Sequence, residues 1–173
     1  MQNPLASIQL ALDELRSMQL DRELRADPVL VPSVFFDLDP AESEAELFLR
    51  SDVGEMFSAQ VVLNKPGRWL TLTLELLRCD LSECGLIGIA CESSATRSVP
   101  IQTFLRSGME KGFRDTFFER TVIAYQERGA HVDALFIDRH PELIAEAPWR
   151  NLVFQFPVEN FDITFHDIRL FAA

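Results

Sequence analysis

Hydrophobic residues follow two different periods along the chain. Near its start they recur every three or four positions, the period of an amphipathic helix, and form one apolar stripe: Leu5, Ile8, Leu12 and Leu15. Asn3 can cap the free amides of a first turn, and Pro4 at the first helical position loses a hydrogen bond that it would not have made. The pattern predicts a helix that ends near Gln19.

From Pro28 onward the period changes to two, as in β-strands. In the segment RWLTLTLELL, residues 68–77, leucines occupy one face, and the opposite face carries Trp69, Thr71, Thr73 and Glu75. Similar segments, bounded by Pro, Gly, Asp, Ser or Asn, give roughly nine or ten short strands. No helical stretch separates them, so the sequence predicts an all-β fold: an antiparallel β-sandwich with jelly-roll connections.

Together these patterns predict an N-terminal helical extension over residues 1–27 and a jelly-roll β-sandwich domain over residues 28–173. The apolar stripe of the extension needs a cover, either the sandwich or a second protein chain. An isolated helix of this length is marginal in water, which favours docking on the sandwich. The other alternative makes the helix a contact for a homo-oligomer or a protein partner.

The last strand, FDITFHDIRLF, contains an irregularity. Its apolar residues fall into two halves that are one residue out of step: Phe161, Ile163 and Phe165, then Ile168 and Leu170. An extra residue at His166 and Asp167 would let both halves face the core, as in a β-bulge. The pattern therefore predicts a bulge with two adjacent polar side chains turned outward.

Charge narrows the range of partners. The chain has 27 acidic and 16 basic residues and a net charge of −11, which repels nucleic acid and anionic membrane surfaces alike. Residues 1–18 carry Asp13, Glu14 and Arg16 where a secretory signal needs an apolar stretch. We expect an acidic cytoplasmic protein without nucleic-acid or membrane partners.

Reactive groups are few. Cys79, Cys84 and Cys91 lack the paired spacing or the neighbouring histidines of a zinc site, so they are interpreted as buried small hydrophobic residues. No nucleophile elbow, zinc-protease motif, phosphate loop or dinucleotide fingerprint is present. The sequence therefore predicts no catalytic residue, and a small enzyme on the same sandwich is the least favoured function.

The order of elements resembles the galactose-binding-like jelly-roll superfamily, which contains many non-catalytic carbohydrate-binding modules. Four stretches carry the resemblance: GRWLTLTLEL, PIQTFLRSG, GFRDTFF and the ending NLVFQFPVENFDITFHDIRLF. The resemblance implies a protein that holds a saccharide or another ligand without catalysis. The leading hypothesis is therefore a protein that binds a carbohydrate or glycan-related ligand as an accessory to glycan synthesis. It also implies a structural calcium ion, since an aspartate in the terminal strand of such modules often helps to hold one, and Asp167 matches that position.

Saccharides bind to flat apolar rings beside planar hydrogen-bonding groups. Trp69 and Glu75 share the outward face of their strand, and Gln102, Arg106 and Gln155 can project onto the same face from neighbouring strands. These five residues are predicted to bind the ligand. The alternative is a solvated sheet face, which antiparallel sheets routinely have, in a structural or interaction module without a small ligand.

Trp149 and Arg150 precede the strand NLVFQFP in a loop. A tryptophan beside an arginine can stack on a sugar ring and clamp its hydroxyls, so both are further ligand-binding candidates. Alternatively, Trp149 closes one end of the core and Arg150 pairs with a surplus acid. In FRDTFFER the alternating charges predict an ion pair of Asp115 with Arg106 or Arg114.

Overall fold

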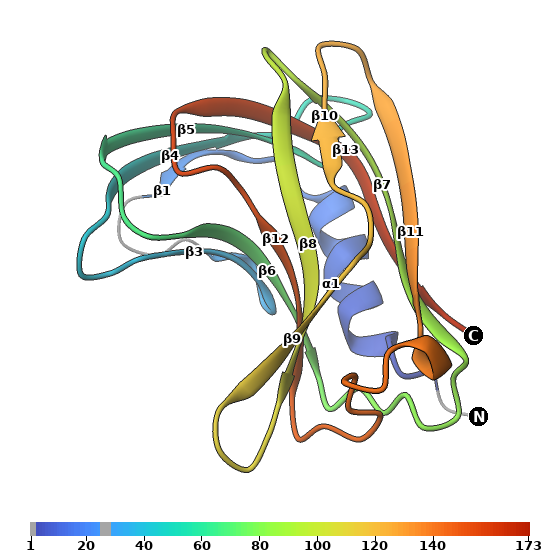
Figure 1. The fold of residues 1–173 in the computed structure, drawn as a ribbon. Coiled ribbons are helices and arrows are strands. Elements are labelled where there is room, and N and C mark those ends of the chain that lie inside the picture. Colours follow the sequence, from blue (N-terminus) through green and yellow to red (C-terminus); the bar gives the residue numbers. More distant parts are fainter. Residues whose placement is uncertain (1–2, 25–28) are drawn as a thin grey trace.

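Two antiparallel sheets stack face to face in the computed structural model, which describes residues 3–24 and 29–173 (Figure 1). Sheet A consists, in spatial order, of β1 (Asp21–Leu24), β4 (Glu44–Arg50), β5 (Phe57–Lys65), β13 (Phe161–Ala172), β7 (Leu86–Ala95) and β11 (Gly129–Phe136). Sheet B consists of β10 (Val122–Ala124), β8 (Val99–Gly108), β12 (Arg150–Gln155), β6 (Leu70–Leu77), β3 (Val34–Leu38) and β2 (Val29–Val31). A further strand, β9 (Phe113–Phe117), also pairs with β8, and a short 3-10 helix, η1 (Ile137–Arg139), follows β11. The predicted β-sandwich is confirmed.

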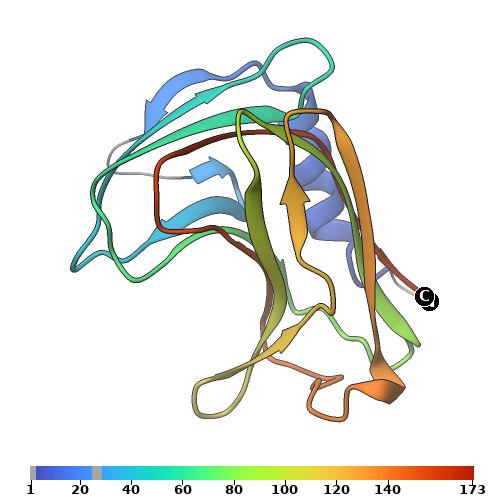
Figure 2. The ribbon, with the colours of Figure 1, turned by 45° about the horizontal axis from the view of Figure 1, so that its top comes forward.

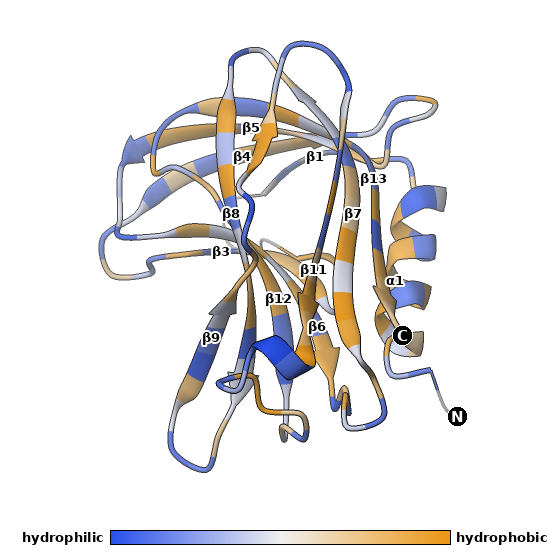
Figure 3. Ribbon diagram, turned by 45° about the vertical axis from the view of Figure 1, so that its right-hand side comes forward, coloured by the Kyte–Doolittle hydropathy of each residue, from blue (hydrophilic) through white to orange (hydrophobic). Residues whose placement is uncertain are grey.

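The core lies between the sheets and follows the alternation of the sequence. The inward leucines of β6 are almost completely buried: Leu70, Leu72, Leu74 and Leu76. Between the sheets Phe156 stacks on Phe161, with ring centroids 5.0 Å apart, and Phe165 lies 5.4 Å from Phe57. Figure 3 shows how hydrophobic and hydrophilic residues alternate along the strands.

Helix α1 (Ala6–Ser17) closes one side of the sandwich by packing against β13, β6 and β2. It is shorter than predicted and begins later, at Ala6, so Leu5 rather than Asn3 is the N-cap residue and no side chain caps the helix. Asn3 Oδ1 accepts a hydrogen bond from the Leu5 amide at 2.9 Å in the turn before the helix. The four residues of the apolar stripe are at most 1% exposed. Docking on the sandwich, the favoured of the two predicted covers, is therefore what the structure shows.

The predicted bulge in β13 is also confirmed. The register between β13 and β7 shifts between Phe165 and Asp167, and both apolar halves of the strand are buried. Strand β5 pairs only with residues 161–165 of β13, whereas β7 continues to residue 172. Helix α1 lies beside the half that β5 leaves unpaired, and Arg16 Nη2 donates to the Ile168 carbonyl at 2.6 Å.

Several smaller predictions can be placed. Cys79 and Cys91 are buried and free; burial raises the pKa of the Cys79 thiol to about 11 and that of Cys91 to about 12. Cys84 is half-buried. The predicted division between residues 27 and 28 falls outside the described residues. Within the described part of the chain, α1 is too short and too polar to cross a membrane.

Replacing Leu12 by alanine tests the docking of α1. Because Leu12 is 1% exposed, we expect Leu12→Ala to lower the free energy of unfolding by about 2–5 kcal/mol in urea denaturation. Leu10, on the same helix but 72% exposed, is the matched control. Leu10→Ala should change the free energy of unfolding by about 0.5 kcal/mol or less. Equal effects of the two substitutions would contradict the docking.

Candidate functional site

The outer face of sheet B, turned away from α1 and sheet A, carries four of the predicted ligand-binding residues. Gln155 of β12 lies opposite Gln102 of β8, and Asn151 of β12 lies between Arg106 of β8 and Glu75 of β6. Residues directly opposite each other in antiparallel strands project to the same face. The structure thus places these side chains in two rows across three strands, and the row of Thr73, Val153 and Phe104 lies between the two.

The centre of this face is sheltered although it points away from the core. Val153, Thr73 and Phe104 lie in one row across it and are 3%, 5% and 3% exposed. Figures 1 and 2 show the strands of sheet B bending around the side opposite α1. Side chains of the face itself also cover its centre: the ring of Phe117 packs on Phe104 with centroids 5.0 Å apart, and the Arg106 guanidinium lies 5.3 Å from the Phe104 ring centroid.

Aromatic rings and one ion pair form the β9 end of the face. Arg106 donates to both carboxylate oxygens of Asp115 at 2.8 Å, so the predicted pair is formed with Arg106 rather than Arg114. Its guanidinium lies 4.0 Å from the ring centroid of Phe113. Phe104 and Phe117 pack with centroids 5.0 Å apart. The Nη1 group of Arg106 has no hydrogen-bond partner among the described residues and remains available as a donor.

Trp69 lies immediately before β6, at one end of the same face. It is half-buried, and the Arg68 guanidinium sits 5.0 Å from its ring centroid. Arg68 is itself held by Asp39, which is buried and accepts from Arg68 Nε at 2.7 Å. This hydrogen bond lowers the pKa of Asp39, so the carboxylate stays charged. Trp69 therefore has an arginine on one ring surface.

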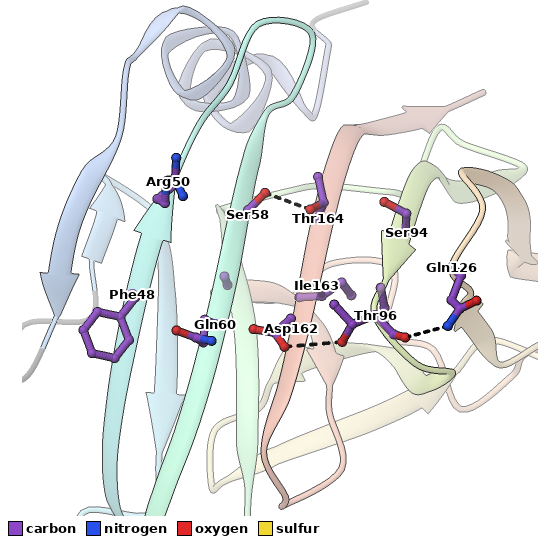
Figure 4. A pocket seen from close by; sticks show the side chains of 12 residues that line it. Phe48, Arg50, Ser58, Gln60, Ser94, Thr96, Gln126, Asp162, Ile163 and Thr164 are labelled. Carbon is purple, nitrogen blue, oxygen red and sulfur yellow. Dashed lines mark hydrogen bonds between the residues drawn. The ribbon is translucent and has the colours of Figure 1, made fainter.

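A second candidate lies on the opposite side of the sandwich, where sequence reasoning indicated no site. An open hollow of about 640 Å³ crosses β4, β5, β13 and β7 on the outer face of sheet A (Figure 4). The alternation of the sequence turns most of the lining side chains outward, while Ala59, Ala95 and Ile163 belong to the buried core beneath them. The alternation does not tell which outward surface is hollow. The lining residues are Phe48, Arg50, Ser58, Ala59, Gln60, Ser94, Ala95, Thr96, Gln126, Asp162, Ile163 and Thr164.

No protein-family model and no curated protein sequence matches the chain. Solved structures do match. The family 11 carbohydrate-binding module of the cellulosomal cellulase Lic26A-Cel5E of Clostridium thermocellum superposes with a TM-score of 0.57 at 10% identity, covering 89% of this chain and 96% of that one. The chain has the fold of carbohydrate-binding modules.

Two further modules share this jelly-roll fold. The family 30 module of Cel9D-Cel44B from Clostridium thermocellum gives a TM-score of 0.56 at 14% identity, with 88% of this chain and 97% of that chain covered. The CBM22-1 xylan-binding domain of Xyn10C from Paenibacillus barcinonensis gives a TM-score of 0.54 at 6% identity, with 79% of this chain and 85% of that chain covered. At such low identities the likeness concerns the fold.

Arg150 has a different place from the one expected. It is completely buried, and its guanidinium donates to the carbonyls of Cys79, Ile144 and Ala145 and to Ser107 Oγ, at 2.6 to 3.1 Å. Complete burial keeps the guanidinium out of reach of a ligand, and no acid is among these four partners, so neither predicted role of Arg150 is seen. The residue instead ties the loop before β12 to the core.

Trp149 lies at the margin of the outer face of sheet B. It is 37% exposed, and its ring rests on Gly108, where a Cβ atom would come within 2.4 Å of the indole Nε1. The Gly108 amide donates to the Trp149 carbonyl at 2.9 Å. One side of the indole is thus packed against β8, while its exposed part remains accessible to a ligand.

Asp167 does not find the surroundings of a calcium ligand. Its Oδ1 accepts from Arg16 Nε at 2.8 Å and its Oδ2 from Arg169 Nε at 2.5 Å. Partial burial opposes ionisation, but these two bonds hold the pKa of Asp167 below its ordinary value. Calcium needs six to eight oxygen ligands, and no group of three or more His, Cys, Asp or Glu residues in the described part of the chain could hold a metal. The predicted calcium ion does not fit here.

Arg150→Met is expected to lower the free energy of unfolding by about 3 kcal/mol or more, because three carbonyls and a hydroxyl lose their buried donor. The matched control is Arg114→Met: Arg114 is exposed and makes one long contact, 3.4 Å, to the Glu142 carbonyl. The free energy of unfolding of Arg114→Met should stay within about 0.5 kcal/mol of that of the unsubstituted protein. Chemical denaturation measures both, and a small effect at Arg150 would contradict its anchoring role.

The stability of the protein should fall on mild acidification. Burial, with a smaller contribution from Arg128, lowers the pKa of His166, whose Nε2 bonds to Ser94 Oγ at 2.8 Å. The unfolded chain then binds a proton at this imidazole more readily than the folded chain does. The stabilising contribution of the neutral His166 side chain is therefore fully present above about pH 6.5, the pKa of a free imidazole, and is lost as the pH falls below it. In His166→Gln the free energy of unfolding should vary less between about pH 7.5 and 5.5. An unchanged pH profile would contradict the assignment.

Proposed function

We propose that the protein binds a saccharide non-catalytically on the outer face of sheet B. The observation that carries this proposal is the convergence of two amides, an arginine and aromatic rings on one sheltered sheet face. Gln102 and Gln155 lie opposite each other, and neither side chain makes a hydrogen bond to the described residues. Each amide offers donors and an acceptor, which suits the paired hydroxyls of a sugar.

Apolar contact for a sugar ring is available beside these groups. Phe113 and Phe117 are 50% and 45% exposed, so each ring presents a flat apolar surface that a sugar ring can contact. Asp115 has both carboxylate oxygens bonded to Arg106. Since glycoside hydrolysis needs one protonated and one free carboxyl group, this pairing supports binding without catalysis.

The structural neighbours suggest which saccharides to test first. One of them is a xylan-binding domain, and another was solved with a β-1,3-1,4-mixed-linked tetrasaccharide. A role accessory to glycan synthesis, a place in the cytoplasm and oligomerisation through α1 remain predictions. The buried stripe of α1 favours the saccharide-binding hypothesis over the interaction module, because Leu10 is the one large hydrophobic residue of the helix that stays exposed for a partner.

Phe117→Ala tests the proposed face. Loss of an aromatic ring that contacts the ligand costs about 1–2 kcal/mol, so affinity for xylotetraose or the mixed-linked tetrasaccharide should fall about tenfold in titration calorimetry. Phe136→Ala is the matched control, since Phe136 is 41% exposed but belongs to sheet A.

Two outcomes would contradict the proposal. One is the absence of saturable binding of any neutral oligosaccharide by the unsubstituted protein. The other is an equal loss of affinity in Phe117→Ala and Phe136→Ala. The variant Gln155→Ala, which removes an unbonded amide, gives a second measurement that does not depend on aromatic packing.

A further inference from the structure

The hollow on the outer face of sheet A is built from two rows of side chains. One row runs across four strands from Phe48 through Gln60 and Asp162 to Thr96. With strands about 4.8 Å apart, such a row spans roughly 14 Å. Its length and the volume of about 640 Å³ fall in the range of binding sites for ligands of a few rings.

The second row, Arg50, Ser58, Thr164 and Ser94, supplies the floor. Short hydroxyl side chains occupy its centre, while the longer chains of Arg50 and Gln126 stand at the two ends, as Figure 4 shows. The floor is fixed by its own hydrogen bonds: Ser58 Oγ to Thr164 Oγ1 at 2.7 Å, and Ser94 Oγ to His166 Nε2 at 2.8 Å. The hollow therefore follows from side-chain size and is held in shape.

Several hydrogen-bonding groups that line the hollow have donor or acceptor atoms without a partner among the described residues. The Gln60 amide and the Arg50 guanidinium make no hydrogen bond or ion pair to the described residues. Asp162 accepts from Thr96 Oγ1 through Oδ2 at 3.3 Å, which leaves Oδ1 as an acceptor. Gln126 is held by its Nε2, which donates to the Thr96 carbonyl at 3.0 Å, so its Oε1 is likewise available.

The charge of the hollow indicates the class of ligand. Among its twelve lining residues only Arg50 and Asp162 are charged, and they balance. The chain as a whole carries −11. An anionic ligand would meet this overall repulsion, whereas an uncharged polyhydroxylated ligand needs the mixture of donors and acceptors found here. The Phe48 ring adds one apolar surface at the β4 end.

We propose that this hollow is a second saccharide site, for a short uncharged oligosaccharide. It lies on sheet A and the face proposed above lies on sheet B, so the two sites are on opposite sides of the sandwich and can be filled together. One chain would then bridge two glycan chains, and its avidity for a polysaccharide would exceed its affinity for either fragment. The occupancy of the hollow does not depend on the first site, whereas bridging rests on both.

Titration of the isotope-labelled protein with xylotetraose and with the mixed-linked tetrasaccharide, followed by amide NMR, tests the hollow. Saturable shifts are expected at the amides of Ser58, Gln60, Ser94 and Thr164, separately from those at Gln102 and Gln155. Thr164→Phe fills the hollow from an outward position and should abolish the first set only. Ala130→Phe adds a ring to the same face outside the hollow and should leave both sets intact.

The outcomes separate the two sites. Chemical-shift changes confined to the amides of Gln102 and Gln155 overturn the second site and leave the proposed function standing. Chemical-shift changes confined to the amides of the hollow overturn the proposed face on sheet B and leave the second site standing. Gln60→Ala, which removes an exposed amide without filling space, should weaken binding at the hollow about tenfold even if Thr164→Phe fails to fold. Precipitation of a mixed-linked β-glucan by the unsubstituted protein but not by Gln60→Ala would support bridging, and equal precipitation by both would overturn it.

Discussion

Strand β13 sets the constraint on which the rest of the architecture depends. It must keep apolar residues of both halves in the core while its neighbour on one side changes, because β5 pairs only with residues 161–165. The bulge adds one residue and so restores the phase of Ile168 and Leu170. Helix α1 then covers the backbone edge that β5 leaves, with Arg16 bonded to the Ile168 carbonyl. The first and last elements of the chain are thereby stabilised together.

The same bulge divides the outer face of sheet A into two regions. Before it, the outward side chains of β13 are Asp162 and Thr164, which line the hollow. After it, Asp167 is held between Arg16 and Arg169 and serves the packing of α1. His166 stands at the boundary and fixes Ser94. The hollow therefore ends before the part of β13 whose polar side chains bond to α1. Ligand binding and helix docking involve different residues of the strand.

The parts of the fold that could be predicted are those that depend on local periodicity. The alternation of Leu70 to Leu76, the stripe of α1 and the phase change at His166 are each visible within about ten residues of sequence, and the structure confirms all three. Burial on the outer face is different. Val153 and Phe104 point away from the core and are nevertheless buried, and Phe104 is covered by Phe117, which comes from the separate strand β9. No local pattern reports this.

Arg150 shows the same limit for a single residue. Its partners lie in segments around residues 79, 107 and 144, and three of the four are backbone carbonyls, which leave no trace in the identity of any side chain. An arginine next to Trp149 is therefore equally compatible, in sequence, with a ligand clamp and with a buried anchor. The hollow could not be predicted for a related reason: serines and threonines on an outward face occur on any solvated strand.

Electrostatics separates the two candidate surfaces from the rest of the molecule. The acidic surplus of the chain would disfavour any anionic ligand at long range. On each candidate surface, however, charged side chains are few and both signs occur. On sheet B, Arg106 is paired with Asp115 and Glu75 lies in the same row as Arg106; in the hollow, Arg50 and Asp162 are the two charged lining residues. Neutral, hydroxyl-rich ligands can use such a mixture of donors and acceptors without meeting the long-range repulsion that an anion would meet.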